Sequence, residues 1–130
     1  MDIGRTEPRS STIFVCITCR RSGDSEDAPR PGAELANATA KAAEQTNITV
    51  RKVRCLANCT RGPSAVVRCD GAWSYVFGGL DETRDAAALV TGALLLASSS
   101  DGLMPWQGRP EALKRGLIAR VPPLHYEEPE

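Results

Sequence analysis

The sequence is poor in aromatic residues, has a single histidine and carries no excess of either charge. Aromatic residues make up 5% of the 130 residues, so a hydrophobic core must consist mainly of aliphatic side chains. His125 is the only histidine, which excludes metal sites that need two of them and argues against general-base catalysis by histidine. The 16 basic and 16 acidic side chains cancel, which argues against a dedicated nucleic-acid-binding protein.

Long apolar segments are also missing. The longest apolar run, residues 86–97, is about half as long as a membrane span. The N-terminal stretch MDIGRTEPRSST has no apolar segment of the kind that a secretory signal needs. We therefore expect a cytoplasmic protein without membrane segments. We expect no nucleic-acid partner either.

The length suits one domain, flanked by two less regular segments. Residues 1–11 are polar and are expected to form a flexible arm. Residues 12–98 contain the regular hydrophobic patterns and every cysteine. Residues 99–130 form a C-terminal extension, in which a short helix is expected to begin at Arg109-Pro110-Glu111 because Pro is favoured at the first helical position.

Within residues 12–98 the pattern alternates between strands and helices. The expected strands span residues 12–15, 48–54, 65–69 and 72–77, and the expected helices 33–45 and 82–97. Asp70-Gly71 predicts a type I′ hairpin turn, and Asp81 is expected to cap the second helix. A helix joins the first two strands, so they should be parallel. The order β-α-β-β-β-α predicts an α/β fold of thioredoxin-like type, with a mixed four-stranded sheet and a C-terminal helical extension.

Five cysteines are the strongest chemical signal. Cys16 and Cys19 follow the first expected strand, and Cys55 and Cys59 follow the second. The carboxyl ends of adjacent parallel strands lie side by side, so these four thiols should converge at one edge of the sheet. Cys69, at the end of a hairpin strand, is expected to be a small buried or half-buried side chain.

Three kinds of chemistry fit these cysteines. Four thiolates suit either a 2Fe-2S cluster or a zinc ion, and the spacing does not separate the two. A non-redox protein that binds or delivers zinc or another metal would use the same four residues. The Cys16-x-x-Cys19 pair also fits a thiol–disulfide oxidoreductase, in which Arg20 and Arg21 would favour the thiolate.

The segment that begins VRCLANCTRGPSAVVRCDG resembles the second half of the thioredoxin-like 2Fe-2S ferredoxins and of the small 2Fe-2S subunit of respiratory NADH dehydrogenase. The matching features are Cys55, Cys59, Pro63, the following hairpin and the Gly79-Leu80 pair. The first half departs from the pattern, because only two residues separate Cys16 from Cys19. The resemblance implies an electron carrier, not a catalyst, with a 2Fe-2S cluster on the four cysteines. It also allows a homodimer.

The whole chain is also similar to a bacterial family of small predicted metal-binding proteins, through FVCITCRRSG and the C-terminal segment MPWQGRP. That similarity implies a loose link to cobalamin or metal metabolism. No acidic residue lies between positions 45 and 69, and several basic residues lie near the cysteines. They form either a solvated basic face or a docking surface for an acidic redox partner, near Arg20, Arg21 and Arg61.

Two further expectations concern single features. Pro63 stands where thioredoxin-like folds often have a cis proline, which suggests the hypothesis of a cis bond there. The apolar residues of the extension are expected to pack on the domain and not to form an exposed patch. They are Met104, Trp106, Leu113, Leu117 and Ile118.

Overall fold

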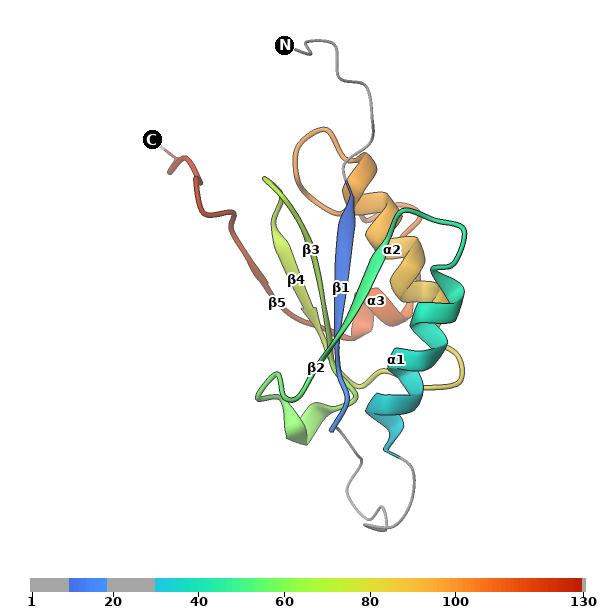
Figure 1. Cartoon of the computed structure of the whole chain (residues 1–130). Helices are drawn as coiled ribbons and strands as arrows, with labels where there is room; N and C mark the ends of the chain where they lie inside the picture. The colour runs from blue at the N-terminus through green and yellow to red at the C-terminus, as the bar shows by residue number, and fades with distance from the viewer. Residues whose placement is uncertain (1–9, 19–29, 130) are drawn as a thin grey trace.

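A five-stranded sheet organises the computed structural model, which describes residues 10–18 and 30–129 (Figure 1). The strands are β1 (Ser11–Cys16), β2 (Thr49–Val53), β3 (Ala65–Cys69), β4 (Ser74–Phe77) and β5 (Leu117–Val121). The helices are α1 (Pro31–Ala42), α2 (Ala86–Ser98), the short α3 (Ala112–Arg115) and the 3-10 helix η1 (Cys59–Arg61). The predicted α/β class is thereby confirmed.

The strand order is β2-β1-β3-β4-β5. β1 and β2 are parallel and joined through α1, as predicted, whereas all other neighbouring strands are antiparallel. β3 and β4 form the predicted hairpin. The parallel pair therefore occupies one side of the sheet, and the antiparallel strands extend it on the other side.

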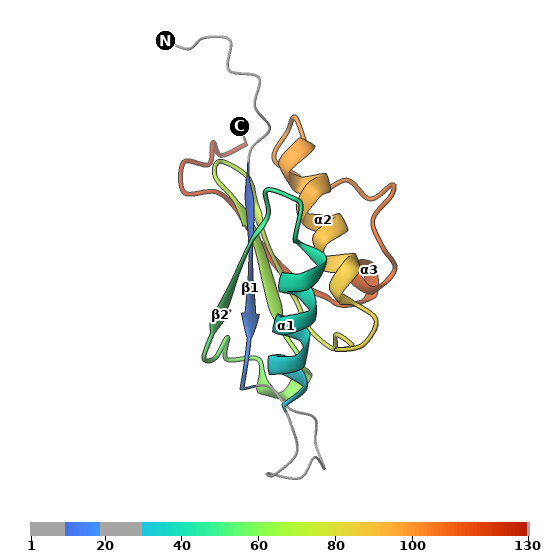
Figure 2. The ribbon, with the colours of Figure 1, turned by 45° about the vertical axis from the view of Figure 1, so that its right-hand side comes forward.

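The core lies between the sheet and the two long helices. α1 and α2 pack side by side on one face (Figure 2). Ile13 and Val15 of β1 are fully buried there, as are Leu35 of α1 and Leu89 of α2. Burying one such aliphatic side chain contributes about 2 kcal/mol, so this layer supplies much of the stability. In the described part of the chain, no helix covers the opposite face.

The N-terminal boundary of α2 differs from the prediction. The Asp81 carboxylate accepts hydrogen bonds from the amides of Thr83 and Arg84 at 2.8 and 3.0 Å. The Asp85 carboxylate in turn accepts the amide of Asp81 at 2.7 Å. Asp81 therefore caps a separate turn over residues 82–84, and α2 begins only at Ala86. The hydrogen bonds from Thr83 lower the pKa of Asp81.

The hairpin turn between β3 and β4 also differs. Gly71 has a φ of 77°, but Asp70 has no positive φ. The amide of Ala72 donates to the carbonyl of Cys69 at 3.0 Å. A positive φ at the third turn position alone is typical of a type II turn, so the predicted type I′ turn is wrong.

The C-terminal extension contributes a strand, where only helical structure was predicted. Gly116 ends α3, and residues 117–121 then pair with β4 as β5. Pro122 and Pro123 end the strand because proline has no amide to donate. Met104 and Leu113 are buried as predicted, whereas Trp106 is 60% exposed. Among the described residues, no helix combines the length and hydropathy that crossing a bilayer requires.

Candidate metal centre

The carboxyl ends of β1 and β2 lie side by side and lead into the predicted cysteine pairs. Cys16 is the last residue of β1 and the register partner of Val53, the last residue of β2. The amide of Ile17 donates to the carbonyl of Val53 at 2.9 Å, so the pairing continues beyond the strand. Cys55 follows two residues later, and the ends of β1 and β2 lie at the bottom of the sheet in Figure 1. The prediction that these two strand ends are adjacent is confirmed.

The Cys16 sulfur is packed against the backbone that leads into Cys55. Cys16 has no exposed surface. Its Sγ lies 3.6 Å from the carbonyl oxygen of Arg54 and 3.7 Å from the hydroxyl oxygen of Thr18. The Thr18 hydroxyl donates to the same carbonyl at 2.5 Å. These contacts fix the sulfur beside the residue that directly precedes Cys55.

Cys55 lies on the surface, in a loop whose backbone turns toward its sulfur. The amide of Ala57 donates to Cys55 Sγ at 3.2 Å. Ala57 has a φ of 59°, in the left-handed region that residues other than glycine seldom adopt. The loop therefore directs one backbone amide at the Cys55 sulfur, an arrangement that would orient this sulfur as a metal ligand.

Ser64 connects the two cysteine-bearing segments. Its carbonyl accepts the amide of Cys16 at 3.1 Å. Its hydroxyl accepts the side-chain amide of Asn58 at 2.8 Å. Ser64 is fully buried and directly follows Pro63, whose peptide bond with Gly62 is cis, as the sequence suggested. The segment that contains Cys59 is thereby tied to the end of β1.

Gly78 allows the segment that contains Cys59 to pack closely against the rest of the domain. A Cβ at Gly78 would lie 2.7 Å from the carbonyl oxygen of Arg61 and 2.7 Å from Nδ2 of Asn58. It would also lie 2.6 Å from Cδ1 of Ile118 in β5. The amide of Gly78 donates to the carbonyl of Gly116 at 2.9 Å. The cysteine loop and the C-terminal extension therefore meet at a position that only glycine fits.

The remaining predicted site residues are placed as follows. Cys59 is the first residue of η1, and Arg61, the last residue of η1, is exposed. Cys19, Arg20 and Arg21 lie outside the described residues. Over residues 10–18 and 30–129, no three His, Cys, Asp or Glu side chains form a group that could hold a metal ion.

Cys69 lies at the other end of β1, where it is the register partner of Ser11. Cys16 is five residues further along β1, which corresponds to roughly 16 Å of strand. Cys69 is 7% exposed and packs in the hydrophobic core. The prediction of a small buried side chain is therefore confirmed for Cys69.

The donors at this edge suit a thiophilic metal centre. Cys16 and Cys55 offer sulfur, and the contacts described for the two sulfurs are with the backbone amide of Ala57, the carbonyl of Arg54 and the hydroxyl of Thr18. Soft thiolates select iron–sulfur clusters, zinc or copper(I) over magnesium or calcium. The two sulfurs described, those of Cys16 and Cys55, are donors of the soft type that both cofactors require.

Sequence reasoning did not find the supporting residues Ala57, Ser64 and Gly116. Ala57 lies between Cys55 and Cys59, and Ser64 lies between Cys59 and β3. Both are small residues, and their residue types do not indicate a supporting role. The sequence does contain a signal for β5: Gly116 is followed by the β-branched Ile118 and Val121, and then by Pro122. That pattern is typical of a strand and not of a continuing helix.

The fold is similar to that of solved thioredoxin-like [2Fe-2S] ferredoxins from Aquifex aeolicus. One such structure has a TM-score of 0.58 and 21% identity, over 91% of this chain and 99% of the ferredoxin. A wild-type form at 1.5 Å resolution has a TM-score of 0.55 and 18% identity, over 85% and 98% of the two chains. These similarities establish the thioredoxin-like fold.

Two other comparisons concern the sequence. No curated protein matches this chain. A family model described as "Protein of unknown function (DUF1636)" matches residues 13–123. That range includes the four predicted cysteine ligands, Cys69 and all five strands except the first two residues of β1. The chain therefore belongs to the DUF1636 family.

Proposed function

We propose that this protein transfers single electrons by means of a 2Fe-2S cluster held by Cys16, Cys19, Cys55 and Cys59. The observation that carries the proposal is the adjacency of the β1 and β2 ends, which brings the Cys16 sulfur against the backbone next to Cys55. The likeness of the fold to thioredoxin-like [2Fe-2S] ferredoxins supports it. The protein would act as a carrier and not as a catalyst.

When bound, a 2Fe-2S cluster accepts one electron and becomes more negative by one charge. The amide of Ala57 would stabilise the reduced form through its hydrogen bond to Cys55 Sγ. The exposed Arg54 and Arg61 would act in the same direction. The buried Cys16 would keep one side of the site free of water, whereas the exposed Cys55 would leave the other side open to a partner.

The partner we propose is an acidic redox protein in a cytoplasmic setting. Arg51, Lys52, Arg54 and Arg61 are exposed around the carboxyl end of β2. Arg20 and Arg21, outside the described residues, would add to this surface by their position in the sequence. Complementary charge speeds encounter and orients a partner, and its effect decreases as salt rises.

A thiol–disulfide oxidoreductase is less consistent with this geometry. Thiol exchange needs access of one sulfur to another, and Cys16 has no exposed surface. The second pair would also have no role in such an enzyme. Zinc, in contrast, would use the same four thiolates, and the experiment below separates it from the cluster.

The test is iron, sulfide and zinc analysis of the protein purified without added metal, together with its visible spectrum. We expect iron and acid-labile sulfide in equal amounts, and charge-transfer absorption that bleaches with dithionite. Stoichiometric zinc without labile sulfide would overturn the cluster in favour of a metal-binding role. A metal-free protein whose thiol activity survives Cys55→Ser would overturn both the cluster and the metal-binding role.

A further inference from the structure

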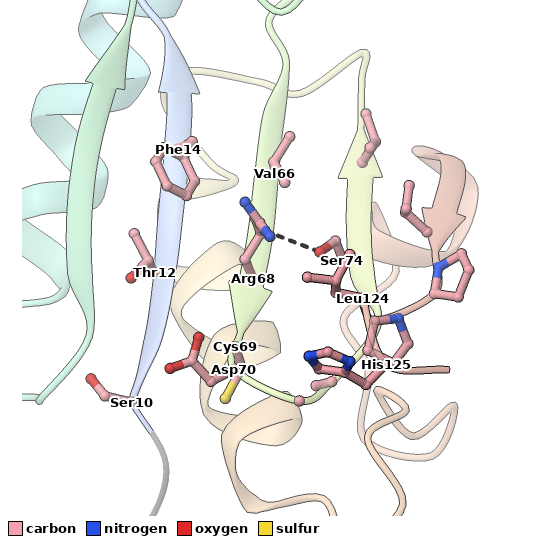
Figure 3. A pocket seen from close by; sticks show the side chains of 16 residues that line it. Ser10, Thr12, Phe14, Val66, Arg68, Cys69, Asp70, Ser74, Leu124 and His125 are labelled. Carbon is pink, nitrogen blue, oxygen red and sulfur yellow. Dashed lines mark hydrogen bonds between the residues drawn. The ribbon is translucent and has the colours of Figure 1, made fainter. Parts of the chain in front are cut away.

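A groove lies on the sheet face that no described helix covers. Its volume is about 840 Å³, and its floor is formed by β1, β3 and β4 (Figure 3). The segment that follows β5 forms one wall, with Pro122, Pro123 and Leu124. The groove lies toward the Cys69 end of β1, away from Cys16. It is therefore separate from the candidate metal centre.

Arg68 lies on the floor of the groove and is held in place by one hydrogen bond. Its Nε donates to the hydroxyl of Ser74 at 3.2 Å (Figure 3). That bond leaves the two terminal amino groups of the guanidinium for a ligand. Over residues 10–18 and 30–129, no carboxylate forms an ion pair with Arg68. A positioned guanidinium of this kind matches a carboxylate, which it can bind through two parallel hydrogen bonds.

Apart from Thr12 and Ser74, the strand side chains around Arg68 on the floor are apolar. Phe14, Val66 and Val76 line the groove from three neighbouring strands, and Figure 3 shows Phe14 and Val66 on the same side of the sheet as Arg68. Register pairing places Val66 between Phe14 and Val76. These side chains form an apolar surface next to the cation, which a flat apolar group can contact.

Acidic groups are scarce around this site. The strand residues that line the groove include no acid; its one described carboxylate is Asp70, in the hairpin turn at the end of the groove. His125 lies on the same end. The centre of the groove therefore combines one cation with an apolar surface, and its charge complements an anion.

The wall of the groove is held by aromatic contacts. Tyr126 meets Trp73 edge to face with ring centroids 5.5 Å apart. The Arg120 guanidinium stacks over the same Trp73 ring at 4.7 Å. Pro122 and Pro123 restrict the backbone between these anchors. Little conformational entropy would be lost when a ligand binds against this wall.

We propose that this groove binds a small aromatic carboxylate. The carboxylate pairs with the terminal amino groups of Arg68, and the ring lies on Phe14, Val66 and Val76. No bond is made or broken. The proposal is independent of the metal centre, so its failure would leave the proposed electron-transfer function untouched.

The experiment is calorimetric titration of the protein as purified with two matched probes, indole-3-acetate and its neutral analogue indole-3-acetamide. The two share the ring and differ in the charge that Arg68 would recognise. We expect the carboxylate to bind roughly tenfold more tightly than the amide. Amide NMR shifts on binding should be confined to the strands around Arg68 and to the wall.

Variants assign the effect to residues. Arg68→Ala should remove the preference for the carboxylate, and Arg68→Lys should restore only part of it, because lysine lacks the planar fork. Phe14→Ala should weaken the binding of both probes. Arg84→Ala, which removes an arginine that is 79% exposed at a distant turn, should change neither. Far-ultraviolet circular dichroism checks that each variant folds.

Equal binding of the two probes, or an unchanged preference in a folded Arg68→Ala variant, would overturn the proposal. Sedimentation of the same samples tests the competing occupant, a second copy of the chain. A dimer that prevents probe binding and dissociates in the Phe14→Ala variant would show that the groove is a homodimer interface and not a ligand site.

Discussion

The two buried cysteines of the sheet, Cys16 and Cys69, lie at opposite ends of the β1–β3 pair and differ in their surroundings. Cys16 is 0% exposed and Cys69 is 7% exposed, so burial does not separate them. Cys16 ends a strand of the parallel pair, where loops bring carbonyl and hydroxyl groups to its sulfur. Cys69 ends a hairpin strand and packs among apolar side chains.

The difference shows how topology assigns roles to identical residues. In a parallel pair both chains leave the sheet at the same edge, so loops and their polar groups gather there. In the hairpin, the chain turns back at once and the cysteine remains in the core. A change at the Cys16 end should therefore affect the proposed metal centre, whereas a matched change elsewhere in the domain should not.

The largest effect should come from the cysteines themselves. Cys55→Ser and Cys16→Ser each remove a proposed ligand, so iron content and visible absorption should be lost. Cys69→Ser should keep both, although a buried hydroxyl in place of the thiol is expected to cost about 1–3 kcal/mol of stability. Iron analysis and denaturant unfolding check this pair. A Cys69→Ser variant that folds but is colourless would contradict the assignment.

Gly78→Ala should have the next largest effect. The added methyl group clashes with the backbone of Arg61, so we expect about 1–3 kcal/mol of destabilisation and a changed reduction potential or visible circular dichroism. Gly92→Ala is the control. The Cβ that it adds would also clash, 2.3 Å from Leu113 Cδ1, but at a position away from the cysteine loop. An altered visible spectrum in both variants, or in neither, would refute a specific role for Gly78.

A pair of hydrogen-bond deletions should give a smaller effect. Asn58→Ala removes the bond to Ser64, and Ser11→Ala removes the bond from its hydroxyl to the carbonyl of Ala93 at 2.8 Å. Each should cost about 1 kcal/mol in urea unfolding. Only Asn58→Ala should shift the reduction potential, because only it loosens the segment with Cys59. A shift of equal size in Ser11→Ala would mean that stability alone sets the potential.

The smallest effect should come from exposed charge. Arg54→Gln removes a positive charge next to Cys55, so the reduced form loses stabilisation and the reduction potential should fall slightly. Arg68→Gln removes a charge that is also exposed, next to Cys69, and should leave the potential unchanged. Voltammetry at low salt measures both, since salt screens exposed charges. A fall of equal size in both variants would contradict a local effect.

The fold could be predicted wherever a hydrophobic pattern and a topological rule agreed. The strand at 65–69 is predicted to the residue, and the parallel β1–β2 pair follows from the helix between them. The start of α2 was missed because Asp81 has two competing roles, and its carboxylate prefers the amides of the next turn. β5 was missed because its pairing with β4 depends on a contact 40 residues or more away in the sequence.

The candidate site could be predicted only in part. Cysteine spacing indicated which strand ends would meet, because that follows from topology. The supporting contacts of Ala57, Ser64 and Gly78 depend on the path of a loop, which no periodic pattern specifies. The groove on the open face was missed for a similar reason, since Arg68 and Phe14 lie on different strands and meet only in the folded sheet.

X-ray absorption at the iron edge on the purified protein tests the proposed metal centre most directly. We expect iron surrounded by sulfur alone, with a second iron as its next neighbour, and the loss of that signal in Cys55→Ser but not in Cys69→Ser. Nitrogen or oxygen ligands, an isolated metal ion or a zinc edge without iron would contradict it.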